Sequence, residues 1–467
     1  MCSFRGAARV IALFAELTGI QSPSYGTIRQ WVYRLGYYCL SNTPLLGKDW
    51  VMILDHTVEL GKEKCLVILG VPQETFQSGH YALNHQDVYL IGLDVVTSST
   101  GERVHAKMEE VSQRYGAPVQ VVSDYGPDVK KGVELFCRQH QGTIHTYDIS
   151  HLVASLFKKE FKDDERFESL GKAITHTAKK INQTDLLFLA PPNQRTKARF
   201  MNVEHRIEWE QRIFDYLERG DFSEVEAGFF LSESQAIRLK IFNSTRDLAK
   251  LTDIAEKFFH TREEFEQALQ ACIGATAFTK YKCLIRAEAD IGKRKVEEAF
   301  SWILEYREDI ETYAQMCRVA KSVLTFIKCK GLGMKTYKEL CETLASLSLQ
   351  NPRALAFKKK ILSQIYEQAS KIPLGETWLG CSDVVESLFG KYKQILIKST
   401  FKTIGRLVLT LPLMTTLLTN DLVMQAMETT KNRDLEQWAD NTFGMSALTK
   451  RKRAFSGYQK QDELILS

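Results

Sequence analysis

Three acidic residues in three separate settings could together carry out metal-dependent chemistry. Asp55 interrupts an apolar, strand-like run that begins at Trp50, and Asp124 ends a second such run just before a Tyr-Gly-Pro turn. Glu386 lies in the segment 383–393, whose apolar spacing predicts a helix. Carboxylates in or beside buried strands are costly unless they are paired, hydrogen-bonded or bound to metal. If the three converge, their oxygens suit Mg²⁺, with Mn²⁺ as an alternative, and they indicate phosphodiester chemistry.

Each acid also has an explanation that needs no metal. Asp55 would face solvent from its strand, and Glu59, on the same strand face by period-two alternation, competes with it as a ligand. Asp124 stands where a turn-forming residue is expected, with Asp128 as its local competitor. Glu386 follows an Asp by three residues, which is the spacing of an N-terminal capping pair.

Composition describes an ordinary globular chain. Its 467 residues, 44% hydrophobic and 25% charged, predict about two to four domains, and the net charge of +5 is too mild to prove a nucleic-acid partner. The ten Cys form no Cys-x-x-Cys pair and no secretory segment opens the chain. We therefore expect a cytoplasmic protein, nucleoid-associated in a prokaryote. The longest apolar region, 407–424, is interrupted by polar residues, so no membrane partner is expected.

Two helices are expected near the N-terminus. Residues 7–18 are amphipathic, and after a break containing Pro23 the spacing resumes over 24–40. The pair fits a helix-turn-helix within region 1–45, and it fits an ordinary helical hairpin equally well. In the first case, Arg29, Gln30 and Arg34 of the second helix would contact DNA.

From Trp50 onward the hydrophobic pattern predicts an α/β core. Short runs rich in Val, Ile and Leu predict strands, and two intervening segments have helical spacing. The expected strands are 50–60, 64–71, 88–96, 119–124 and 143–148, and the expected helices are 101–115 and 129–140. The order βββαβαβ predicts a mixed five-stranded sheet with helices on its faces.

The rest of the chain is expected to be helical. The first part of the core, 50–151, is followed by 152–372, which has little strand-like alternation and predicts a large all-α insertion that interrupts the core. Its clearest helical patterns are 209–217, 234–246 and 296–330. Residues 373–400 would return to the core with the third acid, and 401–467 would form C-terminal helices and a basic tail.

This order of strands, helices and acids resembles the RNase H-like fold and, within it, the DDE transposases and integrases. Asp148 and His151 form an Asp-x-x-His motif similar to the one that follows the second catalytic Asp in Mutator-like and hAT transposases. The segment 382–389 is similar to their third-acid helix, with Asp where Asn is common. Trp378 precedes Glu386 by eight residues, as a Trp does in some of these families. A long helical insertion is a further shared feature.

The resemblance implies roles for these residues. Asp55, Asp124 and Glu386 would hold two Mg²⁺ ions about 3.5–4 Å apart, and His151 would orient a carboxylate or touch the scissile phosphate, with Asp148 in an auxiliary role. A histidine that caps a core helix and a Trp buried among helices are the alternatives. DNA contacts beyond the N-terminal helices are expected from Trp378, Lys393, Lys450, Arg451, Lys452 and Arg453, although the last four also fit a solvated tail.

The expected function is therefore a DDE-type DNA transposase that cleaves transposon ends and transfers the strand into target DNA. Because two ends must be cut together, its partners would be double-stranded DNA and a second copy, as a dimer or larger assembly on DNA. Two alternatives remain open. One is a decayed or domesticated transposase that binds DNA without cutting it, and the other is an RNase H-like nuclease without strand transfer.

Overall fold

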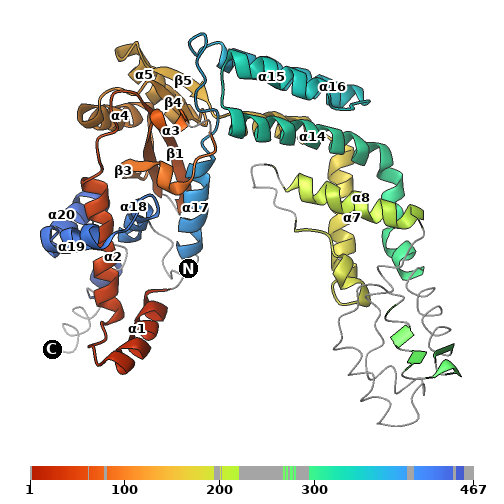
Figure 1. Cartoon of the computed structure of the whole chain (residues 1–467), viewed down its shortest axis with the longest axis horizontal. Helices are drawn as coiled ribbons and strands as arrows, with labels where there is room; N and C mark the ends of the chain where they lie inside the picture. The colour runs from red at the N-terminus through yellow and green to blue at the C-terminus, as the bar shows by residue number, and fades with distance from the viewer. Residues whose placement is uncertain are drawn as a thin grey trace, which may run out of the picture. The chain divides into compact units, whose positions relative to one another are not determined.

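The structure is a computed structural model, and it describes residues 3–60, 63–77, 81–193, 202–219, 294–396, 404–444 and 449–456, with residue 200 and a few positions between 264 and 279. The chain forms two compact units (Figure 1). The first unit combines residues 1–157 with 318–467, and the second contains residues 158–317.

A mixed five-stranded sheet forms the centre of the first unit, as the hydrophobic pattern predicts. Its spatial order is β3-β2-β1-β4-β5; β1 pairs antiparallel with β2 and parallel with β4, β2 pairs antiparallel with β3, and β4 pairs parallel with β5. The strands are β1 (Trp50–Leu60), β2 (Glu63–Pro72), β3 (Tyr89–Val96), β4 (Gln120–Ser123) and β5 (Ile144–Tyr147). The short helix α3 (Glu74–Gln77) and the 3-10 turn η1 (His85–Asp87) connect β2 to β3.

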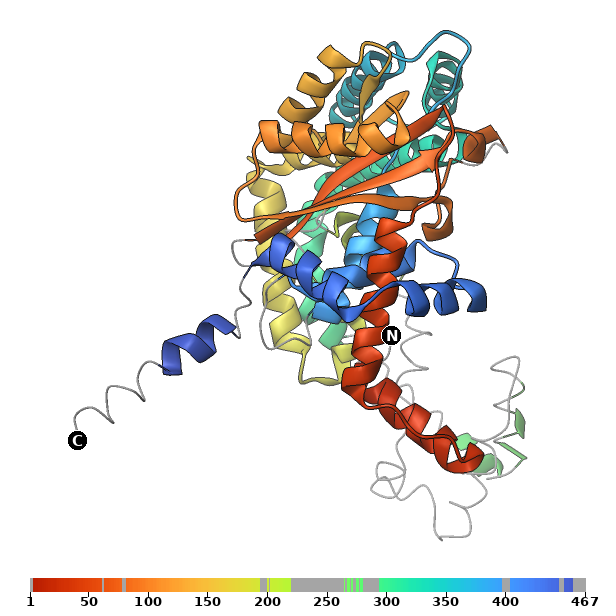
Figure 2. The ribbon, with the colours of Figure 1, turned by 90° about the vertical axis from the view of Figure 1, so that its left-hand side faces the viewer.

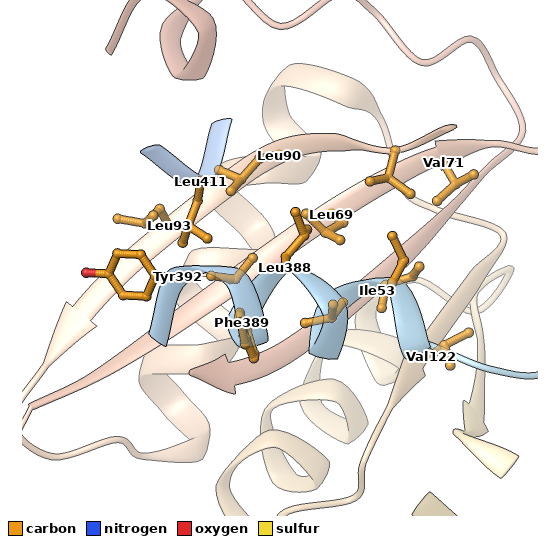
Figure 3. Packing of buried hydrophobic residues seen from close by; sticks show 14 of the residues in the cluster. Ile53, Leu69, Val71, Leu90, Leu93, Val122, Leu388, Phe389, Tyr392 and Leu411 are labelled. Atoms are coloured by element: carbon orange, nitrogen blue, oxygen red, sulfur yellow. The ribbon is translucent and has the colours of Figure 1, made fainter. Parts of the chain in front are cut away.

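Helices cover both faces of this sheet. Since successive side chains of a strand point to opposite sides, each strand packs apolar residues against both layers of helices. On one face, Met52 and Leu54 of β1 pack with α4 (Gly101–Tyr115) and α5 (Pro127–Gln139), which Figure 2 shows in orange above the strands. On the other face, Val51 and Ile53 pack with α17 (Asp383–Leu396) (Figure 3). The apolar side chains of α17 that meet the sheet are Val384, Val385, Leu388, Phe389 and Tyr392.

The N-terminal helices belong to the same unit as the sheet. Ser3 and Ser24 cap α1 (Phe4–Thr18) and α2 (Tyr25–Ser41) through their side-chain oxygens. Leu35 and Cys39 of α2 pack against Ala426 in the C-terminal helices. The C-terminal elements are η4 (Arg406–Leu409), α18 (Thr410–Met414), α19 (Asn420–Thr429) and α20 (Asn432–Phe443). Region 1–45 is therefore packed onto the unit that holds the sheet.

The described residues of the second unit are helical. They include part of α6 (Ile149–Phe161), α7 (Glu165–Ile181), the 3-10 turn η2 (Asp185–Leu189), α8 (Val203–Arg219), the 3-10 turn η3 (Ser301–Tyr306) and the start of α14 (Arg307–Lys330). The helical patterns at 209–217 and 296–330 are confirmed, the latter with the 3-10 turn inside it. The pattern at 234–246 lies outside the described residues.

The second unit is shorter than the expected insertion 152–372. Residues 318–372, including α15 (Met334–Ala345) and α16 (Pro352–Ala369), belong to the first unit. The reason lies in their contacts. The Gln368 side chain accepts a hydrogen bond of 2.9 Å from the backbone of Tyr147 in β5, and Phe357 packs edge-on against Phe157.

Across the part of the chain that the structure describes, we find no helix with the length and apolarity needed to cross a bilayer.

Candidate active site

Strand register brings three aspartates to one end of the sheet. Leu54 of β1 lies beside Ser123 of β4, and Ser123 lies beside Tyr147 of β5. The residue that follows each of them is an aspartate, so Asp55, Asp124 and Asp148 stand in neighbouring positions across the parallel part of the sheet. The register alone therefore explains how two acids that are 69 positions apart in the sequence (124 − 55) come together.

Asp55 is the most desolvated of the proposed ligands. Its side chain points to the face that α17 covers, as those of Val51 and Ile53 do, and only 9% of the residue is exposed. Burial, with the negative charges of Asp124, Glu386 and Asp148, raises the pKa of Asp55 well above its usual range, although the backbone N–H of His56 opposes the rise. Three carboxylates from three other elements thus act on one buried carboxylate.

Helix α17 positions Glu386 at this end of the sheet. The helix rests on the apolar side chains of β1, β2 and β3, with Leu388 and Phe389 against the strands in Figure 3. Glu386 lies in the first turn of α17 and is partly exposed, which leaves its carboxylate accessible from outside. A side chain added at Gly390, one turn further on, would meet open space, so a ligand backbone has room to approach there.

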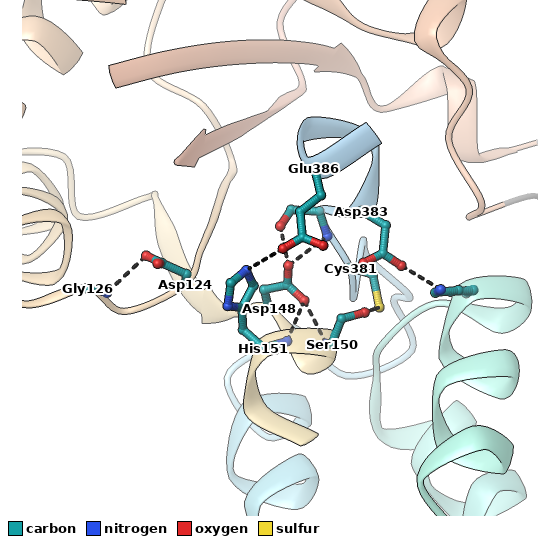
Figure 4. A network of polar contacts seen from close by, with 10 residues as sticks. Asp124, Gly126, Asp148, Ser150, His151, Cys381, Asp383 and Glu386 are labelled. Atoms are coloured by element: carbon teal, nitrogen blue, oxygen red, sulfur yellow. Dashed lines mark hydrogen bonds and ion pairs between the residues drawn. The ribbon is translucent and has the colours of Figure 1, made fainter. Parts of the chain in front are cut away.

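The buried carboxylate of Asp148 ties the start of α17 to the sheet. Its Oδ1 accepts hydrogen bonds from the backbone N–H groups of Ser150 (2.7 Å) and His151 (3.3 Å) at the start of α6. Its Oδ2 accepts from the backbone N–H of Ser382 (3.2 Å) and from the Ser382 hydroxyl (Figure 4). Asp148 therefore caps one helix and anchors the residue before another.

His151 faces Glu386 from the first turn of α6. Its Nε2 is buried and lies 3.5 Å from Oε1 of Glu386, as the dashed line in Figure 4 shows. The geometry is that of an ion pair if the ring is protonated, and Nε2 makes no hydrogen bond among the described residues. Asp383, by contrast, pairs with Lys328 at 2.7 Å. The two acids of the expected capping pair thus have separate partners.

The competitor Asp128 has a different environment. Its Oδ2 lies 3.7 Å from Nδ1 of His56, and although burial opposes this, a hydrogen bond from Ser99 and the charge of His56 hold its pKa below the usual range. Burial lowers the pKa of His56. Asp128 is therefore stabilised as a carboxylate by its own partners, which makes it less suited than Asp55 to an added cation. The side chain of Glu59, the competitor on β1, lies outside the described residues.

Asp124 immediately precedes a turn residue with a strained backbone. Its Oδ1 accepts a hydrogen bond of 2.9 Å from Gly126, so the turn-forming explanation holds for one of its two oxygens. The next residue, Tyr125, has a φ of 58°, a left-handed conformation that is unusual for a bulky residue. Its ring stacks on Tyr147 with centroids 4.4 Å apart, and Lys371 Nζ donates to its hydroxyl at 3.1 Å.

Tyr125, Ser150 and Ser382 were not foreseen as parts of this site. Nothing in the sequence distinguishes Tyr125 from an ordinary turn residue, and the two serines act through backbone N–H groups as much as through their hydroxyls. The one available signal was position, since Ser150 lies inside the Asp-x-x-His motif and Ser382 opens the third-acid segment.

The donor set suits a hard divalent cation, although it is not arranged as a finished metal centre. Asp55 is buried among like charges, and oxygen ligands of this kind are those that Mg²⁺ and Mn²⁺ prefer. Within the described ranges, however, no group of three His, Cys, Asp or Glu side chains is placed to hold a metal ion as it stands. Binding would therefore require the carboxylates of Asp124 and Glu386 to turn toward Asp55.

The residues expected to contact DNA are in varied settings. Arg29 is exposed, and Gln30 is partly buried. The Arg34 guanidinium is occupied, because it donates to the backbone carbonyl of Thr430 at 2.7 Å and to that of Met427 at the end of α19. The connection between α1 and α2, residues 19–24, also exceeds the roughly three to four residues of a typical helix-turn-helix. These observations favour the helical-hairpin alternative.

Trp378 is a packed residue in this structure. Only 5% of it is exposed, its indole N–H donates to Glu376 at 2.6 Å, and its backbone pairs with Leu332. Burial is therefore the alternative that describes its present state. Lys393 is partly buried near the end of α17. The basic residues of the tail lie on an exposed helical segment, 449–456, and are Lys450, Arg451, Lys452 and Arg453.

No protein-family model matches this chain, and no curated protein matches it either. The geometry of the site therefore carries the functional argument.

Proposed function

We propose that the protein is a DDE-type DNA transposase whose RNase H-like core is interrupted by a helical insertion. One observation carries the proposal. The pairing register of β1 with β4 aligns Asp55 with Asp124, and the charge of Glu386 on α17 also acts on Asp55. These are the three acids that the resemblance selects, and 262 positions (386 − 124) separate the last two in the sequence.

The topology supports the RNase H-like part of the proposal. Such a core needs three antiparallel strands followed by two parallel ones, with the first strand at the centre, and the order β3-β2-β1-β4-β5 agrees with this. The central strand β1 carries the first acid, and the second acid follows β4. The long helical unit between β5 and α17 occupies the place of the proposed insertion.

Asp55, Asp124 and Glu386 would hold Mg²⁺ or Mn²⁺. When bound, the metal supplies an activated water or DNA 3′ hydroxyl and stabilises the leaving oxygen of a phosphodiester displacement. The chain's own residues prepare this. Asp55 carries an unfavourable charge that a cation would neutralise. His151 Nε2 lies 3.5 Å from the carboxylate of Glu386, where a protonated ring would orient it. Gly390 leaves the outer surface of α17 open to a DNA backbone.

The decisive experiment is cleavage of a duplex that carries the inverted repeats flanking the gene, with Mg²⁺ present. We expect Asp55→Asn, Asp124→Asn and Glu386→Gln each to abolish cleavage while leaving folding and DNA binding largely intact. The amides are nearly isosteric but lack the charge that holds the metal. Asp128→Asn and Asp383→Asn are the matched controls, because both lie beside the site and have other partners, and both should retain cleavage.

Two results would contradict this assignment. Normal cleavage by Glu386→Gln together with loss of cleavage in Asp383→Asn would make Asp383 the third acid. Cleavage of any duplex without strand transfer, and without dependence on the inverted repeats, would favour an RNase H-like nuclease.

A protein that binds DNA without cutting it is the second candidate. The observation in its favour is that no three acidic, histidine or cysteine side chains among the described residues stand ready to hold a metal. Binding of the inverted repeats by the wild-type protein, with no cleavage at any Mg²⁺ or Mn²⁺ concentration, would establish this candidate. Under either candidate, double-stranded DNA is the proposed partner and the cytoplasm, or the nucleoid region of a prokaryote, the proposed location.

A further inference from the structure

Helix α1 leaves a long apolar stripe uncovered. Val10 is 49% exposed, Leu13 64%, Phe14 63% and Leu17 83%. These positions recur at helical spacing on one side of α1, while the opposite side carries Ala15, which is buried against the rest of the unit. Figures 1 and 2 show α1 at the end of α2 that is remote from the sheet. A contiguous patch of this kind on a surface helix marks an interaction site.

Charged residues beside the stripe specify the orientation of a partner helix. Arg9 and Glu16 are exposed and lie one heptad apart, so they flank the stripe on the same side. A two-fold axis that turns a second α1 end for end brings this flank of both helices together, so that Arg9 of each copy faces Glu16 of the other. The opposite flank carries Ala7, Ile11 and Thr18 and no charge, so a parallel pair would leave Arg9 and Glu16 unmatched.

We infer that α1 pairs antiparallel with α1 of a second copy of this chain. The stripe is apolar and therefore self-complementary, and the charges beside it are complementary only under the antiparallel two-fold arrangement. A helix of 15 residues is about 22 Å long, which places this contact at the small end of specific interfaces. The dimer is thus weak and concentration-dependent, and it forms without DNA. The inference is independent of the proposed function.

Sedimentation velocity of the full chain, without DNA or divalent ions, tests the pairing. We expect the wild-type protein to pass from monomer to dimer as its concentration rises. Leu17→Glu should weaken dimerisation by on the order of 100-fold, because it places a charge in the most exposed position of the apolar stripe. Leu374→Glu is the matched control, since Leu374 is 92% exposed on a loop elsewhere and its substitution should leave the dimer intact. Circular dichroism of both variants confirms that they fold.

A charge exchange tests the orientation. Arg9→Glu and Glu16→Arg each place like charges opposite one another at both pair positions, so each variant should dimerise on the order of tenfold more weakly. An equimolar mixture of the two variants should regain dimers, because the mixed pair restores both attractions. A mixture that stays as weakly associated as its components would overturn the antiparallel register. A wild-type protein that stays monomeric throughout, or a dimer that Leu17→Glu leaves unchanged, would overturn the proposal as a whole.

Discussion

Replacing Asp55 by Asn is expected to stabilise the metal-free protein while it destroys the proposed activity. Asp55 is buried at the centre of the sheet, and burial and the charges of Asp124, Glu386 and Asp148 all oppose its ionisation. An asparagine keeps the shape and removes the charge. If Asp55 instead stabilised the fold, its replacement would lower the free energy of unfolding. The sign of the change therefore separates a stabilising role from a metal-binding role.

Proton linkage explains why the charge of Asp55 lowers the free energy of unfolding at neutral pH. The pKa of Asp55 is 3.8 in the unfolded chain and well above that in the folded protein, so unfolding releases a proton between the two values. The free energy of unfolding therefore falls as pH rises through this window, by about 1.4 kcal/mol for each pKa unit of difference. Asn does not titrate, so the variant escapes this loss. We expect a gain at neutral pH and no gain at a pH below 3.8. The gain should be on the order of 1–3 kcal/mol, the usual cost of burying a polar group without full compensation.

Urea unfolding in EDTA, from acidic to neutral pH, measures the effect. Adding Mg²⁺ should then stabilise the wild-type protein, by about 2.7 kcal/mol at a hundred times the dissociation constant, and should have little effect on Asp55→Asn. Asp128→Asn is the control of opposite sign. Since the folded pKa of Asp128 is lowered, its charge contributes stability at neutral pH that the variant loses.

An Asp55→Asn variant that is less stable than the wild-type protein in EDTA at neutral pH would contradict this prediction. That result would mean that the carboxylate of Asp55 is held by favourable partners and serves the fold. An equal stabilisation of both proteins by Mg²⁺ would place the metal elsewhere.

Three substitutions test the packing around the site and the hairpin. Gly36→Ala should cost about 1–3 kcal/mol in urea unfolding, because an added Cβ would overlap the carbonyl oxygen of Leu409. Arg34→Met should cost about 1–3 kcal/mol by the same measurement, since the last carbonyls of α19 lose their charged donor. Unchanged stability would mean that these hydrogen bonds do not hold Arg34, and that it can contact DNA instead. Ser382→Ala should cost about 1 kcal/mol and slow cleavage without abolishing it, because Asp148 keeps its backbone donors; full activity would remove Ser382 from the site.

The sheet was predictable because its signals are local. Each strand is a short run of β-branched and apolar residues, and each helix between the strands has its own apolar periodicity, so β1 and α4 have the boundaries that the sequence predicts. By the alternation along β1, Asp55 lies on the same face as Val51 and Ile53, whose side chains pack against α17.

The boundary of the helical unit could not be predicted, because helical periodicity says which face of a helix is buried and not against what it packs. Residues 318–372 have the same pattern as the helices before them, yet they belong to the unit with the sheet. One of the contacts that join them to it is the hydrogen bond that the Gln368 side chain accepts from the backbone N–H of Tyr147. This hydrogen bond joins residues 221 positions apart in the sequence, and it produces no periodic pattern that would predict it.

The position of Glu386 relative to Asp55 could not be predicted from local sequence patterns. Its own helix was predictable, whereas its approach to Asp55 depends on the fold closing a gap of 262 positions (386 − 124). Two features close that gap at the sheet end. The apolar side of α17 is buried against the strands, and Asp148 accepts hydrogen bonds both from the start of α6, where the chain leaves the sheet, and from Ser382, where it returns. One buried carboxylate therefore joins the residues at which the chain leaves the sheet to those at which it returns. The sequence therefore predicts three candidate acids, and bringing them to one end of the sheet depends on these contacts of the folded chain.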